Sequence, residues 1–255
     1  MRKYSVGVFL EVFDNNPTQW KKNLEFIKSL KHAEHIELLL EYLPSSNELD
    51  FFKKLQQEYT IIMHAPFMDL SLLSPHEEIV EASYKCLKKA YEIGILLGAK
   101  AFTIHAGQMP SFWKEEKAID ILKKRVIALK SNESLPVCIE NMPERRSIQI
   151  SFPSTVDNLK KIISFSKLNL DVGHFMKMGV DPVGVLEEFS QNIGDIHLHD
   201  STKGKDHLAL GEGELDIKNF LQMLEKKQYD KFVTLEVIGK TAISKSWKIL
   251  QSYLQ

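Results

Sequence analysis

Short apolar runs rich in β-branched and aromatic residues alternate with longer amphipathic stretches along the whole chain. Runs of the first kind predict strands, and apolar residues that recur every three or four positions predict helices. The expected strands are Ser5–Val12, His35–Tyr42, Thr60–His64, Ala99–Ala106, Pro136–Asn141, Leu168–Gly173, Ile193–His199 and Phe232–Ile238. The expected helices lie near residues 20–32, 47–58, 76–97, 114–130, 154–166, 182–190, 216–228 and 242–254.

Eight strands that each precede a helix predict an α/β fold, a single (β/α)8 TIM barrel. The length of 255 residues suits one such domain over residues 1–255, and no linker or low-complexity stretch divides the chain. A doubly wound open sheet is the alternative. That fold usually carries a glycine-rich phosphate turn after its first strand, and residues 11–16 contain no glycine.

Polar residues recur at alternate positions near the ends of four expected strands, and alternate positions of a strand share one face. The sets are Thr103 and His105; Asn169 and Asp171; Asp195, His197 and His199; and Thr234 and Glu236. The apolar residues between them suit the outer face, which packs against helices. We therefore expect the polar side chains to point inward at the mouth where TIM barrels keep their active sites.

Acidic and histidine side chains gather at the same strand ends. They are His64, His105, Glu140, Asp171, His174, His197 and Glu236. Several carboxylates buried together are unfavourable unless a cation compensates their charge. Mixed imidazole and carboxylate ligands suit Zn²⁺ or Mn²⁺, and a carboxylate-rich subset suits Mn²⁺, Co²⁺ or Mg²⁺. The pattern therefore predicts a divalent metal site and leaves the metal open.

The charge balance argues against a generally basic nucleic-acid-binding protein. The chain has 33 Lys and Arg against 34 Asp and Glu, although a local basic groove is compatible with this balance. Cys86 and Cys138 are too few for a disulfide framework. The first residues lack a secretory signal pattern, and no apolar run approaches the roughly 18 residues needed to cross a bilayer. We expect a cytoplasmic protein with a small-molecule partner and no membrane partner; the oligomeric state stays open.

Five strings near these strand ends occur together and in a fixed order. They are His64-Ala65-Pro66-Phe67, Glu140-Asn141, Leu170-Asp171-Val172-Gly173-His174, His197-Leu198-His199-Asp200 and His207-Leu208-Ala209-Leu210-Gly211-Glu212-Gly213. Each string alone would recur by chance, but their joint order resembles the xylose-isomerase-like TIM-barrel superfamily from about residue 5 to residue 240. That superfamily includes sugar-phosphate isomerases and epimerases as well as the AP endonuclease family 2 (endonuclease IV) enzymes.

For a ketose epimerase, the resemblance implies a single divalent cation held by Glu140, Asp171, His197 and Glu236. The two glutamates of that set also flank the substrate and move its proton. The resemblance therefore makes Glu140 and Glu236 the candidate catalytic pair.

For endonuclease IV, the resemblance implies three zinc ions. The ligands would be the same four residues for one ion, His64, His105 and Glu140 for the second, and His174 and His207 for the third. The third ion also needs an aspartate two residues before His207. Lys205 occupies that position here, and Asp206 is displaced by one residue, which can turn its carboxylate away from a metal.

We therefore expect a divalent-metal-dependent isomerase or epimerase of a small sugar or sugar phosphate, in which two glutamates transfer a proton next to a carbonyl. A dehydratase on the same scaffold would rely on the same charge stabilisation. The alternatives are zinc-dependent phosphodiester hydrolysis of the AP endonuclease type and a non-catalytic metal-binding barrel.

Residues outside the four-ligand set have more than one interpretation. His64, His105, His174 and His207 are candidates for additional metal ligands or substrate contacts. His199 and Arg145 are candidates for substrate binding, and His199 could instead support a metal ligand or serve in packing. His32, His35 and His76 are expected to be surface or capping residues.

Overall fold

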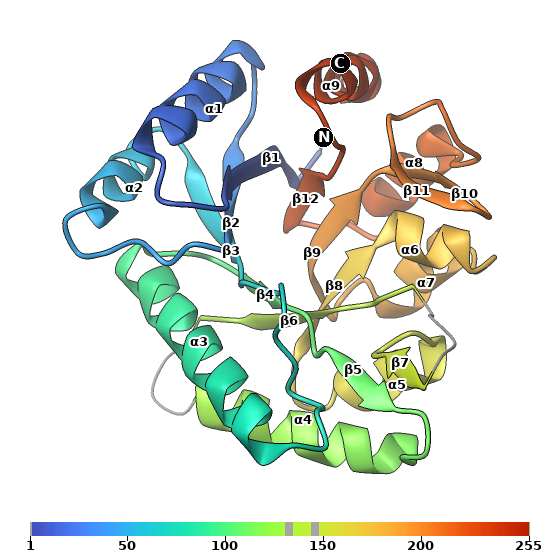
Figure 1. Ribbon diagram of the computed structural model, residues 1–255. Coiled ribbons are helices and arrows are strands. Elements are labelled where there is room, and N and C mark those ends of the chain that lie inside the picture. Colours follow the sequence, from blue (N-terminus) through green and yellow to red (C-terminus); the bar gives the residue numbers. More distant parts are fainter. Residues whose placement is uncertain (1, 131–134, 144–147, 255) are drawn as a thin grey trace.

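Eight parallel strands close into a barrel in the computed structural model, which describes residues 2–130, 135–143 and 148–254 (Figure 1). The barrel strands are β1 (Ser5–Val12), β2 (His35–Leu40), β3 (Thr60–His64), β4 (Phe102–Ile104), β6 (Val137–Glu140), β8 (Lys167–Asp171), β9 (Ile193–Leu198) and β12 (Phe232–Leu235). Neighbouring strands pair in parallel, and β12 closes the ring against β1. The predicted TIM barrel is confirmed, and the open-sheet alternative is wrong.

Helices surround this barrel, as Figure 1 shows. In the described ranges they are α1 (Pro17–Ser29), α2 (Leu49–Leu55), α3 (Glu77–Leu96), α4 (Glu115–Leu129), α5 (Val156–Ile162), α6 (Val172–Lys177), α7 (Pro182–Phe189), α8 (Ile217–Lys226) and α9 (Lys240–Leu254). Side-chain caps define several starts. The Asn16 side chain accepts from the backbone N–H of Gln19 before α1, and Thr155 and Asn158 form a reciprocal capping box at α5.

Three features depart from the predicted alternation. The helix α6 begins inside the stretch that the sequence predicts as strand 168–173, because the Asp171 side chain accepts from the backbone N–H of His174 at 2.6 Å and caps a helix there. Two small antiparallel sheets form outside the barrel: β5 (Gln108–Pro110) pairs with β7 (Gln149–Ser151), which follows α4 and β6 in the chain, and β10 (Asp200–Thr202) forms a hairpin with β11 (Lys205–Leu208). They belong to the loops that follow β4, β6 and β9.

Polar side chains line the barrel interior toward the strand ends. Asn169 Nδ2 lies 2.8 Å from His197 Nε2 and 3.4 Å from Thr103 Oγ1, so three strands meet there through inward-pointing groups. The intervening Leu170 and Ile196 belong to the hydrophobic core instead. The inward polar parity that the sequence predicts is therefore confirmed at these strands.

The opposite end of the interior is apolar. Ile62, Ala101 and Cys138 form a small buried cluster, and Phe232 packs against it. Apolar side chains near the strand starts thus fill that end of the barrel, and the polar side chains lie toward the strand ends.

His35 also lies at the apolar end, and the expectation that it is a surface or capping residue is wrong. Its ring is fully buried in β2, with Nδ1 2.8 Å from Ser5 Oγ and Nε2 3.0 Å from Thr234 Oγ1. Gly7 makes this possible, because a Cβ at that position would lie 2.4 Å from the His35 ring. His32 and His76 are exposed, as expected.

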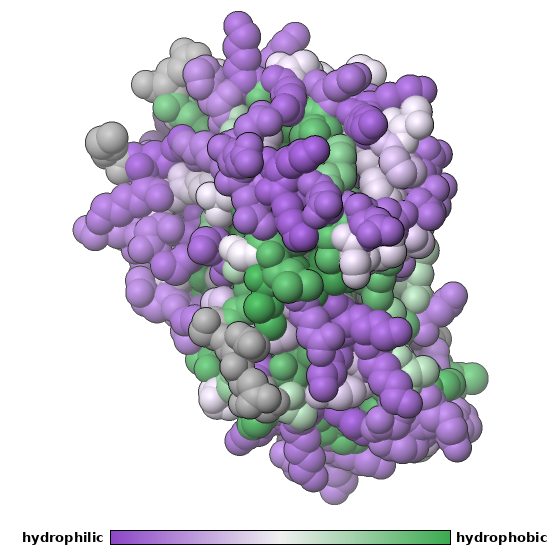
Figure 2. All heavy atoms as spheres, turned by 90° about the vertical axis from the view of Figure 1, so that its left-hand side faces the viewer, coloured by the Kyte–Doolittle hydropathy of each residue, from purple (hydrophilic) through white to green (hydrophobic). Residues whose placement is uncertain are grey.

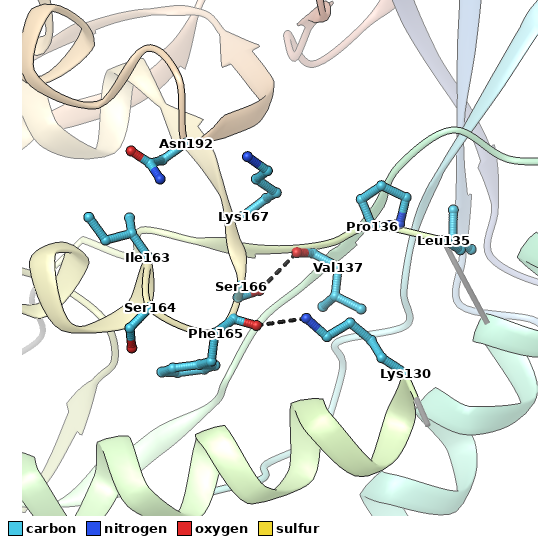
Figure 3. A pocket seen from close by; sticks show the side chains of 10 residues that line it. All are labelled: Lys130, Leu135, Pro136, Val137, Ile163, Ser164, Phe165, Ser166, Lys167 and Asn192. Atoms are coloured by element: carbon cyan, nitrogen blue, oxygen red, sulfur yellow. Dashed lines mark hydrogen bonds between the residues drawn. The ribbon is translucent and has the colours of Figure 1, made fainter. Parts of the chain in front are cut away.

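A surface hollow opens between the starts of β6 and β8 (Figure 3). Two lysines line it, and both are bound to the backbone: Lys130 Nζ donates to the Phe165 carbonyl at 2.6 Å and Lys167 Nζ to the Gln191 carbonyl at 3.1 Å. The hollow therefore lies at the strand starts, away from the predicted site residues at the strand ends.

The outer surface is largely polar. Hydrophilic side chains cover most of the face that carries α1, α2 and α3, with apolar residues gathered near its middle (Figure 2). Within the described ranges, no helix combines the length and the apolar character that a membrane span requires.

Candidate metal centre

Four predicted ligands converge at the barrel mouth. Glu140 ends β6, Asp171 ends β8, His197 lies in β9, and Glu236 follows β12 directly. Each offers a ligand atom, and these atoms lie within 4.8 Å of one another. Glu140, Asp171 and His197 are at most 1% exposed, whereas the Glu236 side chain is 25% exposed. Glu236 is therefore the member of this group that is accessible from the mouth of the barrel.

The spacing of the donor atoms fits a divalent cation. His197 Nδ1 lies 3.0 Å from Glu236 Oε2 and 3.4 Å from Glu140 Oε2. A tetrahedral ion with ligand distances of about 2.1 Å holds its ligands about 3.4 Å apart. His197 Nδ1 and Glu236 Oε2 are also buried atoms without a hydrogen-bond partner in the described structure. A cation bound between these two atoms would give each of them the partner that it lacks.

A second group of donors shares Glu140. His64 Nε2 and His105 Nε2 lie 3.3 Å and 3.1 Å from Glu140 Oε2. His64 Nδ1 lies 2.7 Å from the Ala65 carbonyl, so Nδ1 carries the proton and the Nε2 lone pair faces Glu140. Metal-binding histidines typically donate their other N–H in this way. These residues can hold a second cation, with Glu140 between the two.

A third group contains Asp171, His174, His199 and His207. The His174 Nδ1–H points to the Asn141 carbonyl at 2.9 Å, which leaves its Nε2 lone pair free for a metal or a substrate. His199 is arranged in the opposite sense. Its Nδ1 accepts from the His207 backbone N–H at 2.8 Å, and its Nε2 lies 3.0 Å from Asp171 Oδ1.

The tautomer of His199 determines what it can do. Because Nδ1 accepts a hydrogen bond, the proton of the neutral ring sits on Nε2 and is donated to Asp171. Neither nitrogen retains a lone pair for a metal, and the ring has no exposed surface. Although its nitrogens lie among potential ligands, the His199 ring is engaged by the Asp171 carboxylate and by the His207 backbone.

The displaced carboxylate at position 206 does not join this group. Asp206 Oδ2 pairs with Lys177 Nζ at 2.8 Å, and Oδ1 lies 3.5 Å from His207 Nδ1. Burial would raise the pKa of Asp206, but the hydrogen bond from Lys177 and the neighbouring positive charges outweigh it and lower the pKa to about 2. The carboxylate of Asp206 is thus paired with the Lys177 ammonium group and is not among the third group of donors.

The two glutamates of the four-ligand group are ionised. Burial alone would raise the pKa of Glu140, but His105 and His197 hold it well below its ordinary value. Burial likewise opposes the effect of His197 on Glu236, whose pKa is also well below the ordinary value. Burial would lower the pKa of His207, but the neighbouring carboxylate of Glu236, 3.7 Å away, raises it to about 9. The mouth therefore presents carboxylates beside an imidazolium.

Two buried carboxyl groups lie beneath His197. The sequence places Asp195 on the inner face but not among the predicted ligands, and it does not indicate Glu37 at all. Glu37 Oε1 and Asp195 Oδ2 lie 3.3 Å and 3.6 Å from His197 Nε2. Burial and the charge of Glu37 raise the pKa of Asp195 well above its ordinary value; burial would also raise the pKa of Glu37, but His197 lowers it. The alternation of His35 and Glu37 along β2 could have revealed this inward face. The apolar residues that follow them in β2 obscure that signal.

His207 and His105 are the partly exposed histidines among the predicted site residues that the structure describes. His207 lies in β11, 25% exposed, with Nε2 3.7 Å from Glu236 Oε1. His105 directly follows β4 and is 17% exposed. Arg145 lies outside the described residues.

Sequence comparison identifies the family to which this arrangement belongs. Residues 33–253 match the family described as xylose isomerase-like TIM barrel. The chain belongs to that family. A protein of Methanocaldococcus jannaschii without an assigned function is 28% identical to this xylose isomerase-like barrel over 229 residues, which cover 84% of this chain and 77% of that protein.

Named relatives of the xylose isomerase-like barrel fall into two groups. A probable endonuclease 4 of Thermosipho melanesiensis is 25% identical over 268 residues, covering 94% of this chain and 87% of the relative. Among solved structures, a D-tagatose 3-epimerase-like protein superimposes with a TM-score of 0.85 at 23% identity, covering 98% of this chain and 97% of the other. The second likeness concerns the fold alone. Both groups are named as enzymes or as enzyme-like proteins.

Proposed function

We propose that this barrel is a divalent-metal-dependent isomerase or epimerase of a small sugar or sugar phosphate. The observation that carries the proposal is the convergence of two ionised glutamates, Glu140 and Glu236, on one four-ligand centre. They reach it from strands that are separated in the barrel by β8 and β9. Two carboxylates arriving from different sides can act on a substrate held between them.

Glu236, His207 and His174 have different roles in the proposed proton transfer. Glu236 is the more accessible carboxylate and takes the proton from the carbon next to the carbonyl; a proton then returns to the substrate carbon from Glu236 in an isomerisation, or from Glu140 on the other side in an epimerisation. His207, with Nε2 3.7 Å from Glu236 Oε1, holds a proton beside that base. His174 presents Nε2 to orient a substrate hydroxyl, because its Nδ1–H is already donated to the Asn141 carbonyl. A divalent ion bound by the four ligands would supply a Lewis acid that stabilises negative charge on the substrate oxygens.

The decisive experiment measures turnover and metal content together in full-length protein purified without chelator. A panel of ketoses and ketose phosphates in D₂O, followed by NMR, detects exchange at the carbon next to the carbonyl. Glu140→Gln and Glu236→Gln keep the side-chain size and one oxygen ligand but remove the base. Turnover should fall about 10²–10⁴-fold in each, while metal content falls modestly.

The remaining variants separate chemistry from metal binding. Asp171→Ala and His197→Ala should lose the metal, because alanine offers no ligand. The matched control is Glu58→Gln, which alters a surface carboxylate paired with Lys28 and should leave both readouts unchanged. Full activity in both Glu140→Gln and Glu236→Gln would show that the two-glutamate mechanism is wrong.

A second candidate function is zinc-dependent phosphodiester hydrolysis, favoured by the arrangement of His64 and His105 on Glu140. Two cations sharing a carboxylate are typical of phosphodiester-cleaving sites, and curated relatives include probable endonuclease 4 proteins. Two zinc ions per chain and chelator-sensitive cleavage of abasic duplex, both lost in His105→Ala, would favour this function. One ion per chain, retained in His105→Ala, would favour the isomerase.

A further inference from the structure

The side chain of Asn141 forms two hydrogen bonds with the backbone of Asp171. Its Nδ2 donates to the Asp171 carbonyl at 2.9 Å, and its Oδ1 accepts from the Asp171 backbone N–H at 2.8 Å. Both residues have no exposed surface. The orientation of the amide is unambiguous, because each end meets a backbone group of the opposite character. One amide therefore satisfies both polar backbone groups of a candidate metal ligand.

This pair of hydrogen bonds continues the ladder between β6 and β8 beyond the end of β6. The Asn141 backbone N–H makes the last backbone contact between the two strands, with the Asn169 carbonyl at 3.4 Å. The chain then turns away, since the Met142 N–H donates to the Pro153 carbonyl at 2.7 Å. The Asn141 side chain thus takes the place of the next peptide group of β6. Without it, the buried N–H and C=O of Asp171 would lose their partners, which is unfavourable.

Asn141 lies among three of the candidate donors. Glu140 precedes it in the chain, and its own backbone carbonyl lies 2.9 Å from His174 Nδ1. The third donor, Asp171, leads directly into α6, whose first turn its carboxylate caps. The direction in which this carboxylate leaves the backbone is thus set where the strand ends and the helix begins. A fixed backbone at that point restricts the directions from which the carboxylate can approach a cation.

We propose that Asn141 is a positioning residue of the metal centre, whose amide fixes the Asp171 backbone from the β6 side. Pairing with His197 in β9 holds the same residue from the other side. Groups that orient a metal ligand without touching the ion typically contribute 10–100-fold to metal affinity. Asn141 acts through Asp171 and contacts neither ion nor substrate. The proposal rests on cation binding at the four-ligand centre, which is a premise of the proposed function, but on no particular substrate.

The test compares full-length variants in their affinity for Zn²⁺ and for Mn²⁺ alone, measured by competition with a chelator. Asn141→Leu keeps nearly the same shape but removes both hydrogen bonds, and Asn141→Ala removes them together with the volume of the side chain. The affinity should fall about 10–100-fold in each variant. Similar losses in the two variants would support hydrogen bonding, and not packing, as the origin of the effect.

The matched control changes another buried asparagine that bonds the backbone. Asn158 is 1% exposed, and its Oδ1 accepts from the Ser154 and Thr155 N–H groups at 3.2 Å and 3.3 Å before α5. Asn158→Leu should lower the stability of the metal-free protein, as Asn141→Leu does, but leave the metal affinity unchanged. Co²⁺ adds a readout that a loss of stability alone does not alter, because its visible absorption depends on ligand geometry. The spectrum should change in Asn141→Leu and stay the same in Asn158→Leu.

A further measurement does not depend on the folding of any variant. A crystal structure of the Zn²⁺-loaded wild type should show the Asp171 carboxylate on the ion and the Asn141 amide bonded to both Asp171 backbone groups. An ion bound without Asp171, no cation binding at all, or unchanged affinity in a folded Asn141→Leu would overturn the proposal. Equal affinity losses in Asn158→Leu and Asn141→Leu would also overturn it. Because no readout uses a sugar, absence of isomerase activity would refute the proposed function and leave this inference standing.

Discussion

The histidines at the mouth differ in whether Nδ1 donates a hydrogen bond to the backbone or accepts one from it. The Nδ1–H groups of His64 and His174 are donated to carbonyls, so these rings present a lone pair to the site. His199 accepts at Nδ1 and donates from Nε2, so it presents none. These three histidines thus differ in chemistry because the hydrogen-bond partners of each ring determine whether a nitrogen keeps a free lone pair.

His35 should make the protein sensitive to moderate acid. Burial lowers the pKa of His35 to about 3 from 6.5, although the charge of Glu37 opposes this shift. The unfolded chain therefore binds a proton between pH 6.5 and pH 3 that the folded chain does not. Stability from this group is complete above pH 6.5 and is lost as the pH falls, by about 1.4 kcal/mol per pH unit.

Urea unfolding from pH 7 to pH 4 measures this effect. The free energy of unfolding should fall less steeply in His35→Asn than in the wild type, with a difference of about 3 kcal/mol across the range. The variant is expected to be less stable at pH 7, because Ser5 and Thr234 lose their partner. The control His76→Asn changes an exposed ring and should keep the wild-type slope. Identical slopes for wild type and His35→Asn would contradict the prediction.

At the scale of elements, the hairpin β10–β11 depends on one buried carboxylate. Asp200 has no exposed surface and accepts three backbone N–H groups: those of Ser201 and Leu215 at Oδ1 and that of Gly211 at Oδ2. These bonds join the hairpin to the loop before α8. The hairpin in turn carries His207, whose backbone adopts a φ of 55°.

Asp200→Ala should destabilise the protein by about 3 kcal/mol or more, because it leaves buried N–H groups without an acceptor. Hydrogen exchange at Gly211 and Leu215 should accelerate more than at other amides. Asp181→Ala is the comparison, since this exposed residue caps α7 through two backbone N–H groups and should cost about 1 kcal/mol. Equal losses in the two variants, with protection unchanged at Gly211, would exclude the bridging role.

At the scale of the whole molecule, metal binding should raise stability. A ligand at 100 times its dissociation constant contributes about 2.7 kcal/mol, which for a chain of this size raises the melting temperature by roughly 5–10 °C. Thermal unfolding with Zn²⁺ or Mn²⁺, compared with chelator, measures the shift. His197→Ala should show almost none. A shift of equal size in that variant would indicate binding away from the four-ligand centre.

The barrel and much of its mouth could be predicted from sequence because both depend on periodicity. Alternation of polar and apolar residues placed Asn169 and Thr103 on the inner face, and the strand ends brought the acidic residues together. Glu37 was missed because it lies in a strand that otherwise reads as buried on both faces. The two small sheets outside the barrel and the cap of α6 depend on individual hydrogen bonds, which carry no periodic signal.

The order of the ligand residues along the chain determines when the candidate metal centre can assemble. Its side chains run from His64 in β3 to Glu236 directly after β12, the last strand of the barrel in chain order. During synthesis, the early histidines and Glu140 exist long before the last carboxylate emerges. A cation can acquire its full set of ligands only when β12 has closed the ring against β1. Binding of a cation by all four ligands would therefore follow ring closure, and a chain terminated before β12 would lose ring closure and the four-ligand centre together.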